Sequence, residues 1–367
     1  MWIEALDVVN FRNIAKALIR PSEGVNIFYG DNGSGKTNLL EAVFTLCLGR
    51  SQRGARDIMM VGQSCEGDEL DHFRLEGIGH IGGHEVRLAC AYQNGGRKKF
   101  TIDNNPVRLS RLYQFFCLVS MAPADVTILD GSPTVRRHFL DLYLSQASTN
   151  YLSDLNDYNK ALAQKNSFLK NQGAMECPFD PLLVEHGSRI MAARHKFVHF
   201  LQALAPGYYQ QIANHDDIPE VPLFSFAYKP NVGFENPEDI AVNFENKLVR
   251  YREREKILET AVVGPHRDDI EFLIGSFPAR GYGSQGELRS AVIALLLASA
   301  NFLESRRGAR PILLLDEIFA ELDARRRENL AILFEKFNQI FLTTAIRPPE
   351  IMTSQARIFH IDKGNVK

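Results

Sequence analysis

The segment Gly30-Asp31-Asn32-Gly33-Ser34-Gly35-Lys36-Thr37 decides the fold of this 367-residue chain. It follows the apolar stretch 25–29, which reads as a strand, and it opens the helical run 38–43. A glycine-rich loop between a strand and a helix turns successive backbone N–H groups towards one anion, and the helix N-terminus adds partial positive charge. In such a loop Lys36 reaches the β- and γ-phosphates, and the Thr37 hydroxyl coordinates Mg²⁺. The segment therefore predicts a nucleoside triphosphate site formed by residues 30–37.

A second motif lies near the C-terminus. The apolar run 311–315 is typical of a buried strand, and it ends in Asp316-Glu317. At the tip of this strand Asp316 can hold Mg²⁺, and Glu317 can orient or deprotonate the attacking water. The two motifs together predict an ATPase that uses ATP and Mg²⁺. Its metal ligands are Thr37 and Asp316, and its catalytic residues are Glu317 and Lys36.

A third segment, Ser284-Gln285-Gly286-Glu287, precedes the run 288–304, whose middle is apolar on nearly every face and indicates a buried helix. Serine and glycine at a helix N-terminus often form a simple cap, but such an end also donates N–H groups to an anion. The segment stands roughly thirty residues before the Asp-Glu strand, which is the order of an ATP-binding cassette. In that arrangement Ser284, Gln285 and Gly286 of one subunit cover the γ-phosphate held by the glycine loop of another.

Further stretches narrow the class. With the cassette motifs, they make the chain resemble the RecF family of bacterial recombination mediators over nearly its whole length. These stretches are Asn10-Phe11-Arg12-Asn13, residues 131–141 (GSPTVRRHFLD), residues 264–269 (GPHRDD), Ser284 to Glu287, and Glu321-Leu322-Asp323.

Three positions depart from the family pattern without removing a predicted phosphate or metal ligand. Ser34 stands where glutamine is usual, Lys165-Asn166 replaces Arg-Asn, and Glu287 stands where glutamine is frequent. A carboxylate at 287 would repel triphosphate oxygens unless it points away, which would weaken a dimer closed over ATP.

The resemblance implies an α/β fold: an ABC-type P-loop ATPase lobe with an antiparallel β subdomain and an inserted, mainly helical second lobe. It also implies an ATP-dependent homodimer that binds double-stranded DNA, particularly where single-stranded and double-stranded DNA meet at a gap. Slow, DNA-stimulated ATP hydrolysis would then act as a switch. The resemblance further implies a ring-forming partner, RecR, and a role in loading a recombinase.

Sequence periodicity predicts where the lobes begin and end. We expect the ATPase lobe at 1–122 and 265–367 and the inserted lobe at 123–264. Short alternating segments separated by glycine pairs predict antiparallel strands at 73–75, 85–92 and 99–102. In the inserted lobe, helical spacing predicts helices at 136–146, 151–170 and 182–204, whereas 223–226 reads as a short strand and 244–258 as a charged helix.

The composition, with 45% hydrophobic residues, agrees with a soluble intracellular protein, and we expect a cytoplasmic, nucleoid-associated location. No basic, apolar leader precedes residues 3–9, and the apolar stretch 291–298 is far shorter than the roughly 20 residues that span a bilayer. We therefore expect no membrane association. No CxxC pair occurs, so the cysteines read as reduced thiols: Cys47, Cys65, Cys90, Cys117 and Cys177.

The net charge of −2 excludes a uniformly basic surface, so any DNA contact must be a local patch. Each basic cluster alone is typical of a solvated surface, whereas several on one side would indicate a DNA site. The candidates are Arg53 with Arg56, Arg97-Lys98-Lys99, Arg136-Arg137, Arg306-Arg307 with Arg310, and Arg325-Arg326-Arg327.

Other functional classes stay open at this point. The ATPase subunit of a membrane transporter would share every nucleotide motif but would need a membrane partner. A different SMC-like chromosome ATPase would also share them, although the inserted lobe is too short for long coiled-coil arms. A small-molecule kinase would share only the glycine loop, and residues 284–286 would have no role in it.

Overall fold

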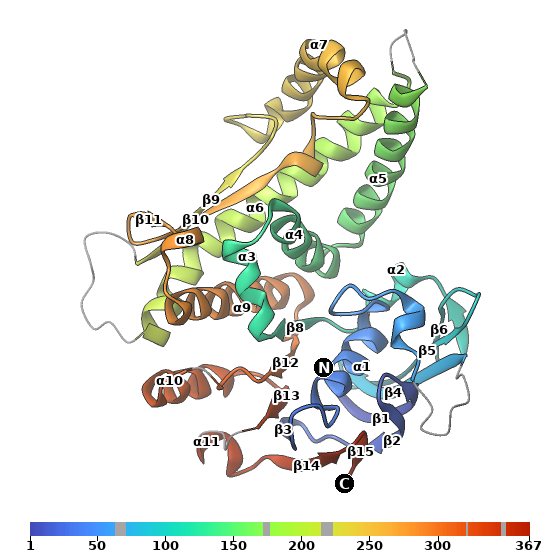
Figure 1. Ribbon diagram of the computed structural model, residues 1–367, viewed down its shortest axis with the longest axis vertical. Helices are drawn as coiled ribbons and strands as arrows, with labels where there is room; N and C mark the ends of the chain where they lie inside the picture. The colour runs from blue at the N-terminus through green and yellow to red at the C-terminus, as the bar shows by residue number, and fades with distance from the viewer. Residues whose placement is uncertain (63–70, 172–176, 214–222, 321, 346–349) are drawn as a thin grey trace. The chain divides into compact units, whose positions relative to one another are not determined.

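The computed structural model describes residues 1–62, 71–171, 177–213, 223–320, 322–345 and 350–367 (Figure 1). The chain packs as two compact units, each discontinuous in sequence. Unit 1 comprises Met1–Asp125, Gln211–Asp216 and Ser299–Lys367, and unit 2 comprises Val126–Gln210 and Asp217–Ala298.

Unit 1 is built around a six-stranded sheet in the order β15-β14-β3-β13-β12-β8. All neighbouring strands are parallel except the β14–β15 pair. Strands β12 and β13 are buried at every position, as the apolar run 311–315 predicts. The strands are β3 (Gly24–Tyr29), β8 (Leu118–Met121), β12 (Ile312–Asp316), β13 (Gln339–Thr344), β14 (Arg357–Asp362) and β15 (Asn365–Val366).

The register of this sheet brings the two nucleotide motifs to one edge. Strand β13 pairs on one side with β3, opposing Thr343 to Phe28, and on the other with β12, opposing Thr343 to Asp316. Because the strands are parallel, the loop after β3 and the acidic end of β12 emerge at the same edge. Helix α1 (Lys36–Leu48) starts there, directly after the glycine loop.

The second sheet of unit 1 is antiparallel, in the order β2-β1-β4-β5-β6-β7. It confirms the strands predicted from the alternating segments, and β4 and β5 alternate between buried and accessible positions. The strands are β1 (Trp2–Phe11), β2 (Ile14–Ile19), β4 (His72–Ile81), β5 (His84–Gln93), β6 (Lys99–Ile102) and β7 (Asn105–Val107). Short helices complete the unit: α2 (Leu109–Leu112), α10 (Ala324–Phe334) and α11 (Glu350–Thr353).

Unit 2 is mainly helical, and its long helices confirm those predicted from apolar spacing, with α6 longer than expected. They are α3 (Thr127–Asp130), α4 (Pro133–Ala147), α5 (Thr149–Lys170), α6 (Asp180–Ala213) and α7 (Ile240–Leu258). A three-stranded sheet in the order β11-β10-β9 completes it, with β9 (Phe224–Lys229), β10 (Asp269–Ile274) and β11 (Phe277–Pro278). Helices α8 (Ala279–Tyr282) and α9 (Gln285–Arg307) follow β11.

The compact units and the predicted lobes differ in where they place residues 265–298. These residues pack in unit 2 because β10 pairs with β9 along its whole length, from Asp269 opposite Lys229 to Ile274 opposite Phe224. Sequence periodicity is local and does not report such a pairing between distant segments. The predicted lobes follow motifs rather than packing, and their boundaries stay a prediction.

The pair Lys165-Asn166, which replaces the Arg-Asn of the family pattern, contributes to the packing of unit 2. The Lys165 ammonium is buried, 2.8 Å from Asp180 and 2.6 Å from Glu255, so it ties α5 to α6 and α7. The neighbouring Asn166 side chain accepts a hydrogen bond from the backbone of Ala261. Lysine therefore supplies the positive charge that two carboxylates require in this interior.

One described helix, α9, is long and apolar enough to cross a membrane by length and composition alone. Of its most apolar window, 78% is buried within the protein, and the core helix of a globular protein passes the same test. The described cysteines Cys47, Cys90, Cys117 and Cys177 are free thiols. Two predicted features, Cys65 and Glu321, lie outside the described residues.

Candidate functional site

The loop between β3 and α1 needs glycine at two of its predicted positions. A Cβ atom on Gly30 would lie 2.1 Å from the carbonyl oxygen of Ile361, and one on Gly35 would lie 2.8 Å from Oδ1 of Asn13. Gly35 also has a φ of 116° at the N-terminus of α1. Asp31, Asn32 and Gly33 form the exposed part of the loop.

The Lys36 side chain is almost fully buried, and it points back into this loop. Its Nζ donates to the carbonyl oxygens of Gly30 (2.8 Å) and Asp31 (3.1 Å). The hydroxyl of Ser34 is also buried, and it has no hydrogen-bond partner among the described residues. A buried, unpaired hydroxyl is costly, so a ligand oxygen in the loop would satisfy it. The loop therefore fits a phosphate group.

Thr37 and Asp316, the two predicted metal ligands, are in contact. The Thr37 hydroxyl donates to Oδ1 of Asp316 at 2.9 Å, and Thr343 donates to the same oxygen at 2.6 Å. The structure thus brings together residues 279 positions apart in the chain. A hydroxyl beside a carboxylate is a set of hard oxygen donors that suits Mg²⁺.

Glu317, the predicted general base, is held from three directions. Its backbone has a left-handed φ of 48°, and its N–H donates to the carbonyl oxygen of Thr343. Its carboxylate accepts from the backbone N–H of Ala345 at 3.0 Å and lies 3.2 Å from Nζ of Lys36. A strained residue kept in place by its neighbours is typical of a functional site. The structure therefore joins both predicted catalytic residues in one cluster.

Several residues that support the loop were not assigned a role from the sequence. Asn13 accepts a hydrogen bond from Asn38 at 2.9 Å, and Arg12 makes a two-pronged contact with the buried Glu41 at 2.9 and 3.0 Å. Gly364, in the β14–β15 turn, donates to the carbonyl oxygen of Ser34. The motif at 10–13 is the sequence signal for the contacts of Arg12 and Asn13, but the motif alone does not indicate their role.

Gln52 and Asp125 were also missed. The Gln52 amide donates to Ser120, which lies on β8 beside β12, while its Oε1 atom is buried without a partner among the described residues. Burial and the nearby charge of Asp316 raise the pKa of Asp125 to about 7, although a hydrogen bond from Ala122 opposes the shift. Both residues add polar groups around the acidic end of β12.

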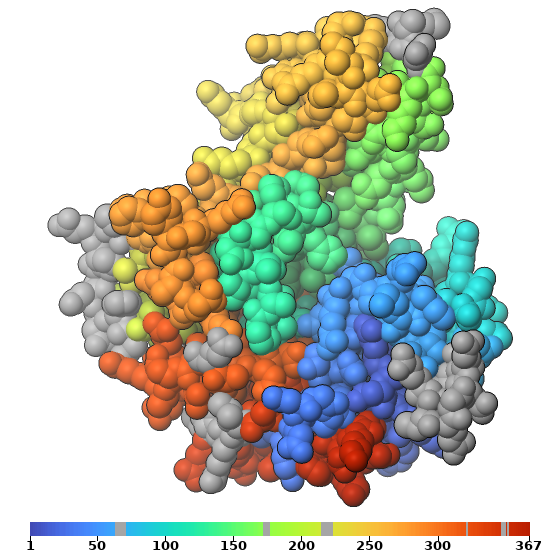
Figure 2. Space-filling view, in the orientation of Figure 1, coloured from blue at the N-terminus to red at the C-terminus, as the bar shows by residue number. Residues whose placement is uncertain are grey.

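The third predicted element lies in unit 2, and Ser284 forms a capping box with Glu287. The Ser284 hydroxyl and backbone N–H donate to the Glu287 carboxylate at 2.6 and 2.9 Å, and the Glu287 N–H donates back at 3.4 Å. Gln285 and Gly286 form the first turn of α9. The Ser284 side chain is exposed, and Figure 2 shows β11 and α8, in orange, at the surface of this unit.

In the C-terminal part of unit 1, several arginines of the basic clusters are bound by carbonyl or carboxylate groups of the protein. Arg307 donates to the carbonyl oxygens of Tyr113 and Gln114, and Arg310 pairs with Glu304 at 2.9 Å. Arg326 pairs with Asp323, whose side chain also caps α10. In unit 2, Arg136 and Arg137 contact Asp269 and Asp268 respectively.

Two clusters instead present exposed charges. Arg53, Arg56, Arg97 and Lys99 are exposed, and none has an ion pair among the described residues. Lys98 pairs with Asp57 at 2.7 Å, which fixes the turn holding Arg53 and Arg56 beside the hairpin holding Arg97 and Lys99. Neighbouring clusters of like charge are what a phosphate backbone requires. Residues 53–56 and 97–99 therefore form the basic patch of unit 1.

Residues 2–365 match the family model described as the RecF/RecN/SMC N terminal domain. The chain is 37% identical over 348 residues to DNA replication and repair protein RecF of Symbiobacterium thermophilum, covering 94% of this chain and 91% of that protein. The chain belongs to the RecF family. It is also 33% identical to RecF of Streptococcus equi subsp. equi, over 100% of this chain and 98% of the relative.

Solved structures agree with this assignment. A structure described as the recombination mediator protein RecF-ATPrS in the RecFOR pathway has a TM-score of 0.87, is 30% identical, and covers 100% of this chain and 97% of its own. The head of an Smc protein has a TM-score of 0.57 at 18% identity, with coverage of 100% and 97%, and shares the fold. The predicted family and the ABC-type ATPase head fold are confirmed.

Proposed function

We propose that this RecF-family chain is an ATP-gated DNA clamp of recombinational repair. The single observation that carries the proposal is the cluster at the edge of the parallel sheet, where Lys36 lies 3.2 Å from Glu317 and Thr37 lies 2.9 Å from Asp316. This cluster combines the groups needed to bind a triphosphate and to hydrolyse it. The solved RecF structure described with ATPrS supports ATP as the nucleotide.

In the proposed site each group has one task. The backbone of Gly30 to Thr37 binds the phosphates, and Lys36 exchanges its carbonyl contacts for phosphate oxygens. Mg²⁺, held by Thr37 and Asp316, would neutralise charge on those oxygens. Glu317, fixed by Ala345, accepts a proton from the attacking water. Hydrolysis then removes the γ-phosphate and the contacts made to it.

We further propose that Ser284, Gln285 and Gly286 of a second subunit cover the γ-phosphate. The exposed end of α9 supplies backbone N–H groups and the Ser284 hydroxyl for this contact. The hydroxyl is bonded to Glu287, so closure must exchange a carboxylate acceptor for a phosphate oxygen. A dimer that depends on these contacts forms with ATP and opens after hydrolysis.

Duplex DNA is the proposed cargo of the closed dimer. The basic patch at 53–56 and 97–99 is the feature that supports phosphate contacts in unit 1. In the other clusters, carbonyls or carboxylates engage Arg136, Arg137, Arg307, Arg310 and Arg326. Relatives described as DNA replication and repair proteins support this ligand. The RecFOR pathway named for the solved structures supports RecR as a partner. The family resemblance is the basis on which we propose single-strand/double-strand junctions as the sites of action and the cytoplasm as the location.

The test of the contact between subunits combines two variants with separate defects. Ser284→Arg should bind ATP normally but fail to dimerise, because the arginine fills the space needed by the triphosphate of the partner. Lys36→Arg should bind ATP but hydrolyse it poorly. Each proposed ATP site combines the glycine loop of one subunit with residues 284–286 of the other. A mixed dimer therefore contains one site with both changes and one site with neither.

We therefore expect ATPase activity to rise above that of either variant when the two proteins are mixed. Ser153→Arg, which changes an exposed serine on α5, is the matched control and should dimerise as the unmodified protein does. If Ser284→Arg alone still dimerises with ATP, the proposed contact between subunits is wrong.

A further inference from the structure

Unit 2 contains a cavity of about 210 Å³ that has no part in the nucleotide site. It lies among α4, α5, α6 and the short turn Pro265–Arg267, and its polar lining includes Thr134, Arg137, Asp141, Asn159, Arg194 and His266. Most of these residues come from the stretches 131–141 and 264–269. Those stretches mark the family in the sequence, yet the proposed ATPase cycle gives them no task.

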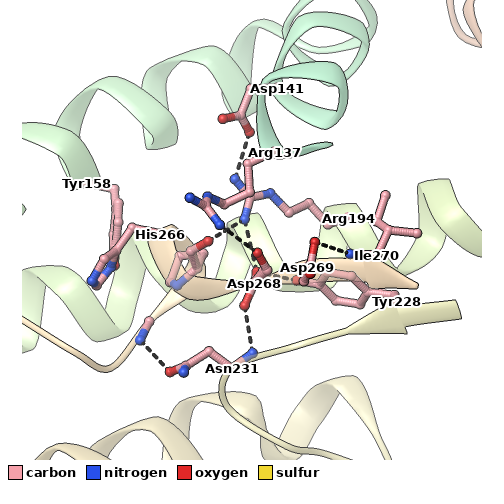
Figure 3. Close-up of polar contacts among 12 residues, drawn as sticks. Arg137, Asp141, Tyr158, Arg194, Tyr228, Asn231, His266, Asp268, Asp269 and Ile270 are labelled. Atoms are coloured by element: carbon pink, nitrogen blue, oxygen red, sulfur yellow. Dashed lines mark hydrogen bonds and ion pairs between the residues drawn. The ribbon is translucent and has the colours of Figure 1, made fainter. Parts of the chain in front are cut away.

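Arg194 is the buried centre of the polar network beside this cavity, and its charge is fully used (Figure 3). It lies 2.9 Å from Asp268 and 2.8 Å from Asp141, and it also donates to the carbonyl oxygen of Pro265 and the hydroxyl of Tyr151. Tyr151 donates to Asp141 as well, so this carboxylate is neutralised by its own neighbours. Arg194 is therefore fully engaged by two carboxylates, Asp141 and Asp268.

Arg137 differs from Arg194 in its partners. Its guanidinium donates to the carbonyl oxygen of Asp268 at 2.9 Å and to the hydroxyl of Thr134 at 3.1 Å, which are both neutral acceptors. Among the described residues no carboxylate lies within ion-pair distance of it. The cavity lining therefore holds two guanidinium groups, Arg137 and Arg194, and one carboxylate, Asp141; Asp268, the second carboxylate partner of Arg194, lies outside the lining.

The ionisation of Arg137 and His266 reflects burial first and the surrounding charges second. Burial and the guanidinium of Arg194 lower the pKa of Arg137, against the carboxylates of Asp268, Asp269 and Asp141, which act to raise it. Burial lowers the pKa of His266 to about 4, and Arg267, Arg137 and Lys165 act in the same direction against a hydrogen bond to Ala261. His266 is therefore neutral at pH 7, accepting from Tyr158 at Nδ1 and donating to Ala261 at Nε2. An anion beside Arg137 would favour the charged form of its guanidinium.

We propose that the cavity binds a phosphate group through the guanidinium of Arg137, assisted by the Asn159 amide and the Thr134 hydroxyl. A guanidinium presents several N–H donors in a plane and matches the oxygens of a phosphate. The cavity holds the volume of several water molecules, at about 30 Å³ each, which is enough for one phosphate. The group is either free phosphate or one phosphate of a nucleic-acid backbone.

The experiment measures the melting temperature as phosphate replaces chloride at constant ionic strength. Saturating Mg-ADP is present throughout, so that the glycine loop is occupied. Phosphate should raise the melting temperature of the unmodified protein. The rise should disappear in Arg137→Gln and correspond to about tenfold weaker binding in Asn159→Ala. Arg189→Gln, which changes an exposed arginine on α6, should respond as the unmodified protein does.

Two results would overturn the proposal. One is that phosphate does not raise the melting temperature of the unmodified protein. The other is that phosphate raises the melting temperatures of Arg137→Gln and Asn159→Ala as much as that of the unmodified protein. If Arg137→Gln does not fold, Asn159→Ala decides alone, because Asn159 is exposed and its truncation should leave the fold intact. A short DNA duplex then separates the two sources. If it abolishes the effect of free phosphate, the occupant is a backbone phosphate; if the effect persists, it is free phosphate. Adding Mg-ADP should raise the melting temperature of every variant. This keeps the test of the cavity independent of the proposed nucleotide site.

Discussion

The contact between Lys36 and Glu317 defines the chemistry of the candidate site at the scale of single residues. The Lys36 side chain lies between two loop carbonyls and the carboxylate, so it is held in position before any phosphate binds. A site arranged in advance pays little reorganisation free energy when charge develops in the transition state. Small changes to either side chain should therefore affect turnover more than binding.

Lys36→Arg tests this expectation. The guanidinium keeps the positive charge, but its planar fork cannot occupy the position of the ammonium between the Gly30 and Asp31 carbonyls. We expect ATP affinity to stay close to normal while kcat falls by about a hundredfold. Titration with a fluorescent ATP analogue and a phosphate-release assay measure the two effects. Turnover at the unmodified rate would show that Lys36 does not have the assigned role.

Glu287→Gln tests whether the capping carboxylate opposes closure of the dimer. A glutamine oxygen can still accept from the Ser284 backbone, so we expect helix α9 to lose only about 0.3–1 kcal/mol of stabilisation. Loss of the charge should strengthen ATP-dependent dimerisation by about fivefold, from roughly 1 kcal/mol of removed repulsion. Analytical ultracentrifugation measures the dimer constant, with Glu253→Gln on α7 as the control. Weaker dimerisation in Glu287→Gln would contradict the proposed repulsion between the Glu287 carboxylate and the triphosphate.

The residues predicted from sequence are those whose chemistry is fixed by a local pattern. The octet and the Asp-Glu pair specify Lys36, Thr37, Asp316 and Glu317 because strand, loop and helix are adjacent in the chain. Asn13, Gln52 and Gly364 support the same site through contacts between distant segments. No local periodicity encodes such contacts, so the sequence alone did not reveal them.

At the scale of elements, the buried carboxylate of Asp268 joins the turn before β10 to α6 and to the segment after β9. It accepts from Arg194 at 2.9 Å, from the Tyr228 hydroxyl, and from the backbone of Asn231 at 2.8 Å (Figure 3). The sequence shows a charged GPHRDD stretch but gives no reason to bury it. Asp268 can be buried because Arg194, on α6, supplies the opposite charge.

Asp268→Asn should therefore destabilise the protein. It leaves the guanidinium of Arg194 buried with only one of its two carboxylate partners, and the loss should be about 3–5 kcal/mol. Urea unfolding measures the free energy. Glu271→Gln, at an exposed ion pair with Lys229 on neighbouring strands, is the control and should cost less than about 1 kcal/mol. Equal losses in the two variants would contradict the role of Asp268.

His266 predicts a pH dependence of stability. Its pKa is lowered to about 4 in the folded protein from 6.5, so the unfolded chain binds more protons between these values. The stabilisation is complete above pH 6.5 and is lost as the pH falls towards 4. Protonation at Nδ1 also removes the acceptor for Tyr158. The fall in melting temperature over this range should be smaller in His266→Gln, and an identical fall would show that His266 does not contribute.

At the scale of the whole molecule, the chain combines an ATPase head with a helical unit that carries the Ser284 element. Sequence periodicity predicted the antiparallel strands and long helices, because each has its own repeat of apolar residues. It did not predict the pairing of β9 with β10, which places 265–298 in unit 2. The proposed clamp requires both units, since the glycine loop and Ser284 lie in different ones.

The most direct test of the clamp is sedimentation of Glu317→Gln with and without ATP, each with and without duplex DNA. The amide keeps the shape of the side chain but cannot accept the proton of the attacking water, so ATP should bind without being hydrolysed. We predict a monomer without ATP, a dimer with ATP, and a dimer that retains DNA when both are present. A monomer at saturating ATP, with or without DNA, would contradict the account.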